Sequence, residues 1–219
     1  MLNELTLTDW RREVAEMYAE VRQATEPQSA HVRWREHRDR LFKEHPQSPL
    51  AADDPMRSHG IPYWPYNPAF RFELAVDEVG SGAEHAIATA AGETTRIRQV
   101  GSVQLPEPVN GRLAVWWLEQ YAGGIFVPFR DATAGAETYG AGRYLLDTAK
   151  GADLGFRDRR LVLDFNFSYH PSCRYDPAWQ CPLAPAANVL SSEIKAGERL
   201  AHATSSLPEQ QCQQTDRAD

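Results

Sequence analysis

Glycine is distributed very unevenly along this chain of 219 residues, and that distribution is the strongest constraint on its fold. None of the 14 glycines precedes Gly60, thirteen lie between Gly60 and Gly155, and the last is Gly197. Glycine is costly inside helices and common at the turns of β-hairpins. We therefore predict a helical extension over residues 1–60, packed on a β-rich body over residues 61–202, with a disordered polar tail over residues 203–219.

The first predicted helix has a start signal and one apolar face. Thr6 and Asp9 fit a capping box, and Leu5 and Trp10 stand at the positions of a hydrophobic staple. Pro27 ends the segment, after apolar side chains at helical spacing at Trp10, Val14, Met17, Tyr18 and Val21.

The second predicted helix begins near Ser29 and stops before Pro46, and its basic and acidic side chains alternate. This mixture is typical of a solvated helix face with ion pairs, which we favour over an anion site. His31, His37 and His45 do not have the i, i+4 spacing of a helical metal site, so we expect them at the surface.

The rest of the chain predicts strands. Short apolar or alternating runs lie between turn signals at residues 70–76, 86–90, 94–105, 113–121, 125–129, 143–146 and 161–167. The predicted fold class is mainly β with N-terminal helices (α+β), in which an antiparallel meander forms a barrel or a sandwich capped by two helices.

The composition excludes several classes of protein. The 23 basic and 30 acidic residues give a net charge of −7, which argues against a nucleic-acid partner. Three cysteines are too few for a disulfide scaffold, and no apolar run is long enough to cross a membrane. With no signal peptide evident, the expected location is cytoplasmic. The oligomeric state stays open, with a homodimer as one option.

Residues 161–170 form the most informative predicted strand. Because side chains alternate along a strand, Asp164, Asn166, Ser168 and His170 would share one polar face. Such a face is either the ordinary solvent side of a sheet or part of a site, and from this strand alone we favour the solvent side.

Two cysteines follow this strand. Cys173 and Cys181 are eight residues apart, and His170 stands three before the first. A zinc site formed by these residues with Asp164 is a weak alternative, because structural zinc sites usually pair cysteines two to four apart. A disulfide and a Cys173 nucleophile are further alternatives, but two buried free thiols are the preferred interpretation.

A second polar cluster lies at residues 128–144. Gly140 and Gly142 suit a tight turn better than a phosphate loop. Arg143 could hold a carboxylate ligand with two hydrogen bonds, or pair with Asp164 or Glu137 inside the protein. The candidate ligand-binding residues here are Arg130, Asp131, Thr133, Glu137 and Arg143, with Tyr139 beside them.

These segments resemble the bacterial and archaeal domain-of-unknown-function family 1684 across most of residues 6–200. The residues that carry the resemblance are Pro128, Phe129, Arg130, Asp131, Thr133, Glu137, Thr138, Tyr139, Gly140, Gly142, Arg143, Tyr144 and Leu145, then Asp164, Phe165, Asn166, Tyr169, Pro171, Cys173, Cys181, Pro182, Leu183, Pro185 and Asn188, together with residues 45–50.

The resemblance implies a site but no activity, since the matching positions are mostly polar residues and glycines. The family pattern has Asn at the position of His170 and Glu at that of Ala187. The first departure argues against zinc. The second removes an acid beside Asn188, so a relative that uses that acid would turn over a substrate that this chain only binds.

Three functions fit the sequence. The first is a protein that binds a small polar or anionic molecule in a β-barrel pocket, with Asn166, Tyr169 and Asn188 among the ligand-binding residues. The second is a hydrolase- or isomerase-type enzyme in the same pocket, with Asp164 as general base and Tyr139 or His170 as acid. The third is a non-catalytic interaction module. No cofactor is expected, apart from the weak zinc alternative.

Overall fold

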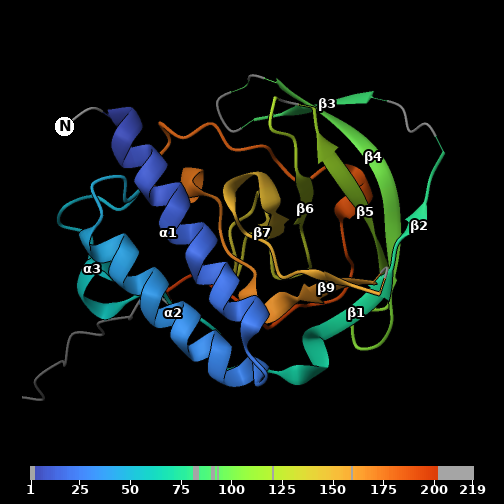
Figure 1. The fold of residues 1–219 in the computed structure, drawn as a ribbon, viewed down its shortest axis with the longest axis horizontal. Coiled ribbons are helices and arrows are strands. Elements are labelled where there is room, and N and C mark those ends of the chain that lie inside the picture. Colours follow the sequence, from blue (N-terminus) through green and yellow to red (C-terminus); the bar gives the residue numbers. More distant parts are fainter. Residues whose placement is uncertain are drawn as a thin grey trace, which may run out of the picture.

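A computed structural model describes residues 3–80, 84–89, 92, 94–119, 121–158 and 160–201. The first two helices, α1 (Asn3–Gln23) and α2 (Pro27–Glu44), pack side by side and precede a short helix α3 (Met56–His59). Figure 1 shows this helical pair on one side of the molecule, with the strands on the other. No helix among the described residues is long and apolar enough to cross a membrane.

The two main helices are confirmed, but three details of their sequence interpretation are wrong. α1 begins at Asn3, so Thr6 lies inside the helix, where its hydroxyl donates to the Asn3 carbonyl at 2.9 Å and forms no capping box. His31 is buried on α2 against the ring of Trp34, although we expected a surface position. The charges of α2 are also not all solvated, because Arg38 is buried too.

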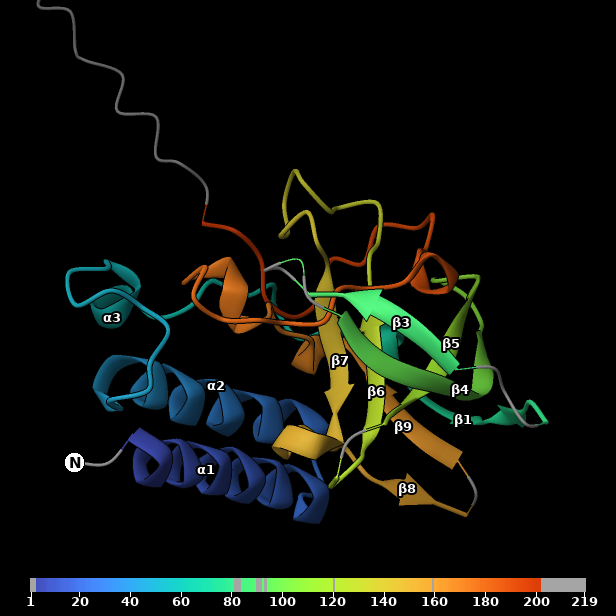
Figure 2. The same ribbon diagram turned by 90° about the horizontal axis from the view of Figure 1, so that it is seen from above.

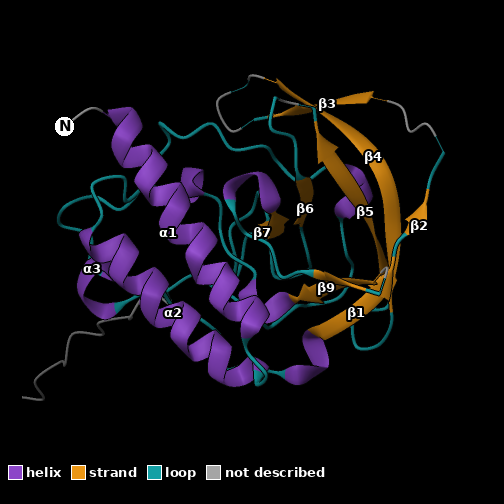
Figure 3. Cartoon of the chain, viewed as in Figure 1, coloured by secondary structure: helices purple, strands orange, loops and turns teal. Residues whose placement is uncertain are grey.

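The strands form two antiparallel sheets. The small sheet has the order β1 (Arg71–Ala75), β9 (Arg160–Asp164), β8 (Phe156–Arg157). The large sheet has the order β2 (Asp77–Glu78), β4 (Thr94–Leu105), β5 (Gly111–Leu118), β6 (Ile125–Phe129), β7 (Arg143–Asp147), and β3 (Glu84–Ala88) pairs with β4. Figure 2 shows the helices beside the β7 end of the large sheet, and Figure 3 separates helices from strands by colour.

The α+β class with N-terminal helices is confirmed, but the sheets do not close into a barrel. The described strands leave β2 and β7 at the two ends of the large sheet, so the arrangement is sandwich-like. A ligand space enclosed by the strands, as in a small barrel, is therefore not present in the described part of the chain.

The predicted strand at residues 161–170 ends early. β9 stops at Asp164, and residues Phe165–Phe167 form a 3₁₀ turn that the Asp164 carboxylate caps by accepting the Asn166 amide at 3.0 Å. The two-residue alternation is lost there, and Asn166, Ser168 and His170 are all buried instead of sharing a solvent face. A side chain that hydrogen-bonds its own backbone two residues on favours a turn over a strand.

Both faces of the large sheet are covered. On β5, Leu113 and Val115 belong to the main core, which they share with Trp34 of α2 and Phe165. The alternate residues of β5, Trp116 among them, belong to a second apolar cluster with Cys173 and Cys181. The segment after residue 168 therefore covers one face of this sheet, and the helices lie beside both the core and that segment.

Candidate functional site

The predicted cluster around Arg143 is assembled, and it lies inside the protein. The guanidinium of Arg143 is fully buried and donates to the Asp131 carboxylate at 3.2 Å. It also donates to the carbonyls of Ile194, Ala196 and Glu198 in the C-terminal segment. Most of the hydrogen-bond donors of Arg143 are therefore already paired with groups of the protein itself.

The other members of this cluster have protein partners as well. Asp131 accepts from the Thr133 hydroxyl at 2.8 Å and from the Ile194 amide at 2.8 Å. Glu137 lies 3.3 Å from the Lys195 ammonium group at the surface. The backbone of Arg130 pairs with residues 188–190. These contacts fasten the C-terminal segment onto the β6–β7 connection.

Asn188 and Asn166 are buried, and each has partners on both sides of its amide. Asn188 accepts from the Trp116 indole at 3.2 Å and donates to the Pro128 carbonyl at 2.7 Å. Asn166 accepts from the Asn67 amide at 2.8 Å and donates to the Asp164 carboxylate at 2.7 Å. Both side chains join distant segments of the fold.

Asp164 lies on the wall of a cavity of about 360 Å³, which Arg22 and Arg71 also line. Burial raises its pKa to about 6, against hydrogen bonds from Asn166 and Tyr66 that favour the ionised form. His170, which we suggested as its acid partner, lines a different cavity.

His170 is held at both ring nitrogens. The Tyr139 backbone amide donates to Nε2 at 3.2 Å, and Nδ1 faces the Glu198 carboxylate at 3.5 Å. Burial and the nearby guanidinium groups of Arg143 and Arg174 hold the pKa of His170 well below its ordinary value, so the ring is neutral. The geometry assigns the proton to Nδ1.

Glu198 is a buried carboxylate that sequence reasoning missed. It accepts two hydrogen bonds from Arg38, at 2.8 and 3.0 Å, and one from the His170 amide. Gly197 places it there with a positive φ of 79°, and a Cβ at that glycine would lie 2.2 Å from the Ser168 hydroxyl. Arg38 and Glu198 are 160 positions apart, so no local pattern could have paired them.

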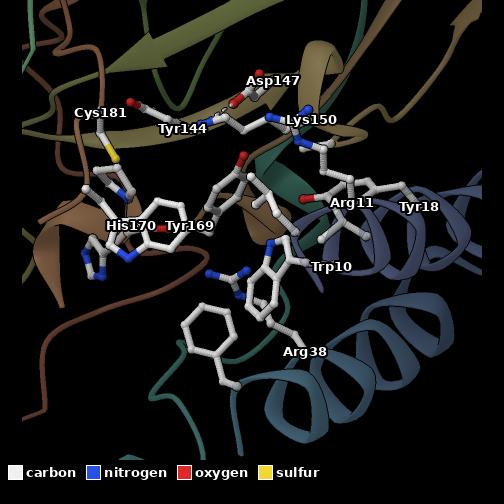
Figure 4. A pocket seen from close by; sticks show the side chains of 17 residues that line it. Trp10, Arg11, Tyr18, Arg38, Tyr144, Asp147, Lys150, Tyr169, His170 and Cys181 are labelled. Atoms are coloured by element: carbon white, nitrogen blue, oxygen red, sulfur yellow. Dashed lines mark ion pairs between the residues drawn. The ribbon is translucent and has the colours of Figure 1, made fainter. Parts of the chain in front are cut away.

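A second cavity, of about 210 Å³, lies between α1 and the β7 end of the large sheet and is here called the α1 cavity. Figure 4 shows side chains of α1 across this space from those of β7 and of the segments that follow it. Aromatic rings form much of its wall: Trp10, Tyr18, Phe42, Tyr144, Tyr169 and Trp179. His170 and Cys181 lie on the same wall.

Charged groups complete the α1 cavity. Arg11 and Lys150 are exposed at its edge, and Asp147 is buried, with its carboxylate 3.9 Å from the Lys150 ammonium group. Oδ1 of Asp147 has no hydrogen-bond partner among the described residues. Burial raises the pKa of Asp147 despite both neighbouring cations.

Of the candidate residues predicted from the sequence, Tyr169, His170 and Cys181 line the α1 cavity, while the Arg143 cluster, Asn166 and Asn188 do not. Trp10 and Tyr18 were recognised only as members of an apolar helix face. Asp147 follows the predicted strand 143–146 by one residue, and a carboxylate directly after a buried strand was the signal that could have indicated it.

Cys173 and Cys181 are free and buried, and they touch one another. The Cys173 amide donates to the sulfur of Cys181 at 3.4 Å. Among the described residues, no group of three or more His, Cys, Asp or Glu side chains is arranged to hold a metal ion.

Comparisons with known proteins agree with the resemblance seen in the sequence. Residues 57–199 match the family described as "Protein of unknown function (DUF1684)", which leaves α1 and α2 outside the match. The solution NMR structure of an uncharacterized protein of Haloarcula marismortui is similar, with a TM-score of 0.55 and 32% identity over 76% of this chain and 90% of that chain. No curated protein matches the chain.

Proposed function

The chain belongs to the DUF1684 family of proteins of unknown function, and we propose from its own geometry that it binds a small molecule in the α1 cavity. The ligand has a flat apolar body and one anionic group. The observation that carries this proposal is a ring-lined cavity with two cations at its edge, Arg11 and Lys150.

The wall of the cavity supports the apolar body. Ligand pockets are typically lined by apolar and aromatic side chains with a few polar groups that fix orientation. Trp10 of α1 and Tyr169, which come from different parts of the chain, both line the cavity. The guanidinium of Arg38 lies 4.9 Å from the centre of the Tyr169 ring. Arg38 is already paired with Glu198, so its role is to hold the ring in place.

The edge of the cavity supports the anionic group. Among the described residues, Arg11 has no ion-pair partner within 4 Å, and the carboxylate within that distance of Lys150 is that of the buried Asp147. Both cations are exposed, so their charged groups are accessible to an anion that enters from solvent. The site proposed here thus lies between α1 and β7, whereas the sequence hypothesis expected it at Arg143 and Asp164.

A direct test uses 8-anilinonaphthalene-1-sulfonate, which combines an aromatic body with a sulfonate. We expect saturable binding of one molecule per chain by isothermal titration calorimetry. In the double variant R11Q/K150Q the affinity should fall roughly tenfold, because each edge cation contributes somewhat less than 1 kcal/mol. Added salt should also lower the affinity of the wild-type chain, because it screens the attraction between the sulfonate and the two cations.

The matched control is R12Q. Arg12 is the exposed neighbour of Arg11, pairs with Asp9 and does not line the cavity. This variant should bind like the wild type. Absence of saturable binding by the folded wild-type chain, or an equal loss of affinity in R12Q, would refute the proposed site.

A further inference from the structure

The two cysteines of the second apolar cluster form an arranged pair. The sulfur of Cys181 accepts the Cys173 amide at 3.4 Å, and it also receives the Cys173 thiol and the Ser172 amide as donors. Several donors directed at one sulfur stabilise a thiolate there. Cys173 is the donor of that pair, so the two thiols have different roles.

The second observation is access. Cys181 is only 3% exposed, yet it lies on the wall of the α1 cavity, which opens to solvent. Cys173 is not among the residues that line this cavity. Cys173 is itself 8% exposed, but a small reagent inside the cavity contacts Cys181 and not Cys173.

The ionisable groups around the pair favour a thiolate at Cys181 and a protonated thiol at Cys173. The Cys173 donors and the Lys150 ammonium group lower the pKa of Cys181, against its burial, while the neighbouring sulfur and burial raise that of Cys173. The other titratable groups that interact with Cys181 are neutral phenols, namely Tyr139, Tyr144 and Tyr169.

We propose that Cys181 is a peroxide-reactive thiolate and Cys173 its resolving thiol, and that the two close to a disulfide in the wall of the α1 cavity. The proposal rests on the arrangement of the two sulfurs and the cavity, and it does not require the ligand proposed above.

The chemistry balances with hydrogen peroxide as the oxidant. The Cys181 thiolate attacks one peroxide oxygen, the O–O bond breaks, and the departing hydroxide takes a proton to become water, leaving a sulfenic acid. The Cys173 sulfur then attacks the Cys181 sulfur, the S–O bond breaks, and the proton of Cys173 leaves with the hydroxyl group as a second water. The two sulfurs are oxidised and one peroxide is reduced.

The pair changes character between these steps. Once Cys181 carries a neutral sulfenic acid, the negative charge that raised the pKa of Cys173 is gone. Cys173 then ionises more readily and can resolve the intermediate.

The test is peptide mass mapping of the full-length folded chain after treatment with hydrogen peroxide and blocking of residual thiols with iodoacetamide. We expect loss of both thiols and a linked Cys173–Cys181 peptide pair, reversed by dithiothreitol. In C173S, dimedone should label Cys181 as the trapped sulfenic acid. In C181S, peroxide should leave Cys173 unmodified.

Cys212 is the internal reference thiol of the same chain. Three outcomes would overturn the proposal: Cys181 stays reduced while Cys212 is oxidised, Cys173 remains equally reactive in C181S, or the disulfide forms with Cys212 instead. The wild-type map decides the question even if a serine variant does not fold. Ligand titration of the reduced wild-type chain, as above, tests the binding proposal separately.

Discussion

At the scale of single residues, buried polar groups dominate this protein, and their partners distinguish structural from chemical roles. The sequence analysis identified the chemistry-bearing residues around Arg143 but not their partners. Arg143 donates to carbonyls at residues 194–198, which carry no sequence motif and lie about fifty positions away. Residue types can be read from a sequence, whereas contacts over that separation depend on the fold.

Asp164 provides a test at this scale. Its pKa in the folded chain is raised to about 6 from an ordinary value near 4, because burial outweighs its hydrogen bonds. Below pH 4 the carboxyl is protonated in both states and costs nothing. As the pH rises from about 4 to about 6, only the unfolded state ionises readily, so stability is lost, and the loss stays constant above that range.

The variant D164N should remove this penalty. We expect its free energy of unfolding, relative to the wild type, to rise by about 3 kcal/mol between pH 4 and pH 7. Urea denaturation at a series of pH values measures this difference. The control D53N changes an exposed aspartate and should follow the wild-type profile. Parallel profiles for D164N and the wild type would contradict the assignment.

At the scale of elements, the bounds of strands and helices were predicted well where the hydrophobic pattern is regular. They were predicted poorly where a side chain hydrogen-bonds to the nearby backbone. The runs at 94–105 and 125–129 were predicted with the bounds of β4 and β6. The strand at 161–170 failed because the Asp164 side chain caps a turn, which no hydrophobic pattern reveals. The helix start failed for a related reason, since Thr6 bonds backward to Asn3.

The ion pair between α2 and the C-terminal segment gives an element-scale prediction. The side chains of Arg38 and Glu198 are 7% and 0% exposed. Removing one partner of such a pair leaves an uncompensated buried charge, so E198Q should lower the free energy of unfolding by about 3 to 5 kcal/mol. Replacing Arg38 as well, in R38M/E198Q, should restore part of that loss.

Urea denaturation of these variants at pH 7 measures both effects. The matched control is E193Q, which lies in the same segment, is exposed and pairs with Lys195 at 3.1 Å. We expect no measurable change for it. If E198Q were as stable as E193Q, the C-terminal segment would not be held by its buried carboxylate.

At the scale of the whole molecule, the sequence predicted the order of helices before strands but left open whether the strands form a barrel or a sandwich. Nothing local distinguishes a closed meander from two open sheets, because both have the same alternating strands and turns. The division of β5 side chains between two apolar clusters depends on which segments cover each face of the sheet. The α1 cavity likewise joins residues from both ends of the chain.

The last prediction concerns whether the helices and sheets unfold together. Trp34 of α2 is 1% exposed, and its ring lies 5.2 Å from that of Phe167 and 5.7 Å from that of Tyr63. Because helices and both sheets share one apolar cluster, W34A should destabilise the whole chain by about 3 to 5 kcal/mol.

Hydrogen exchange followed by mass spectrometry across a urea series reads this element by element. Peptides from α1–α2 and from β4–β5 should share one midpoint in the wild type, and W34A should lower both by the same amount. The control V32A changes a half-exposed residue of the same helix and should leave both midpoints unchanged. A lower midpoint confined to the helical peptides would show instead that residues 1–60 are a separately unfolding extension, and the α1 cavity would then open before the sheets unfold.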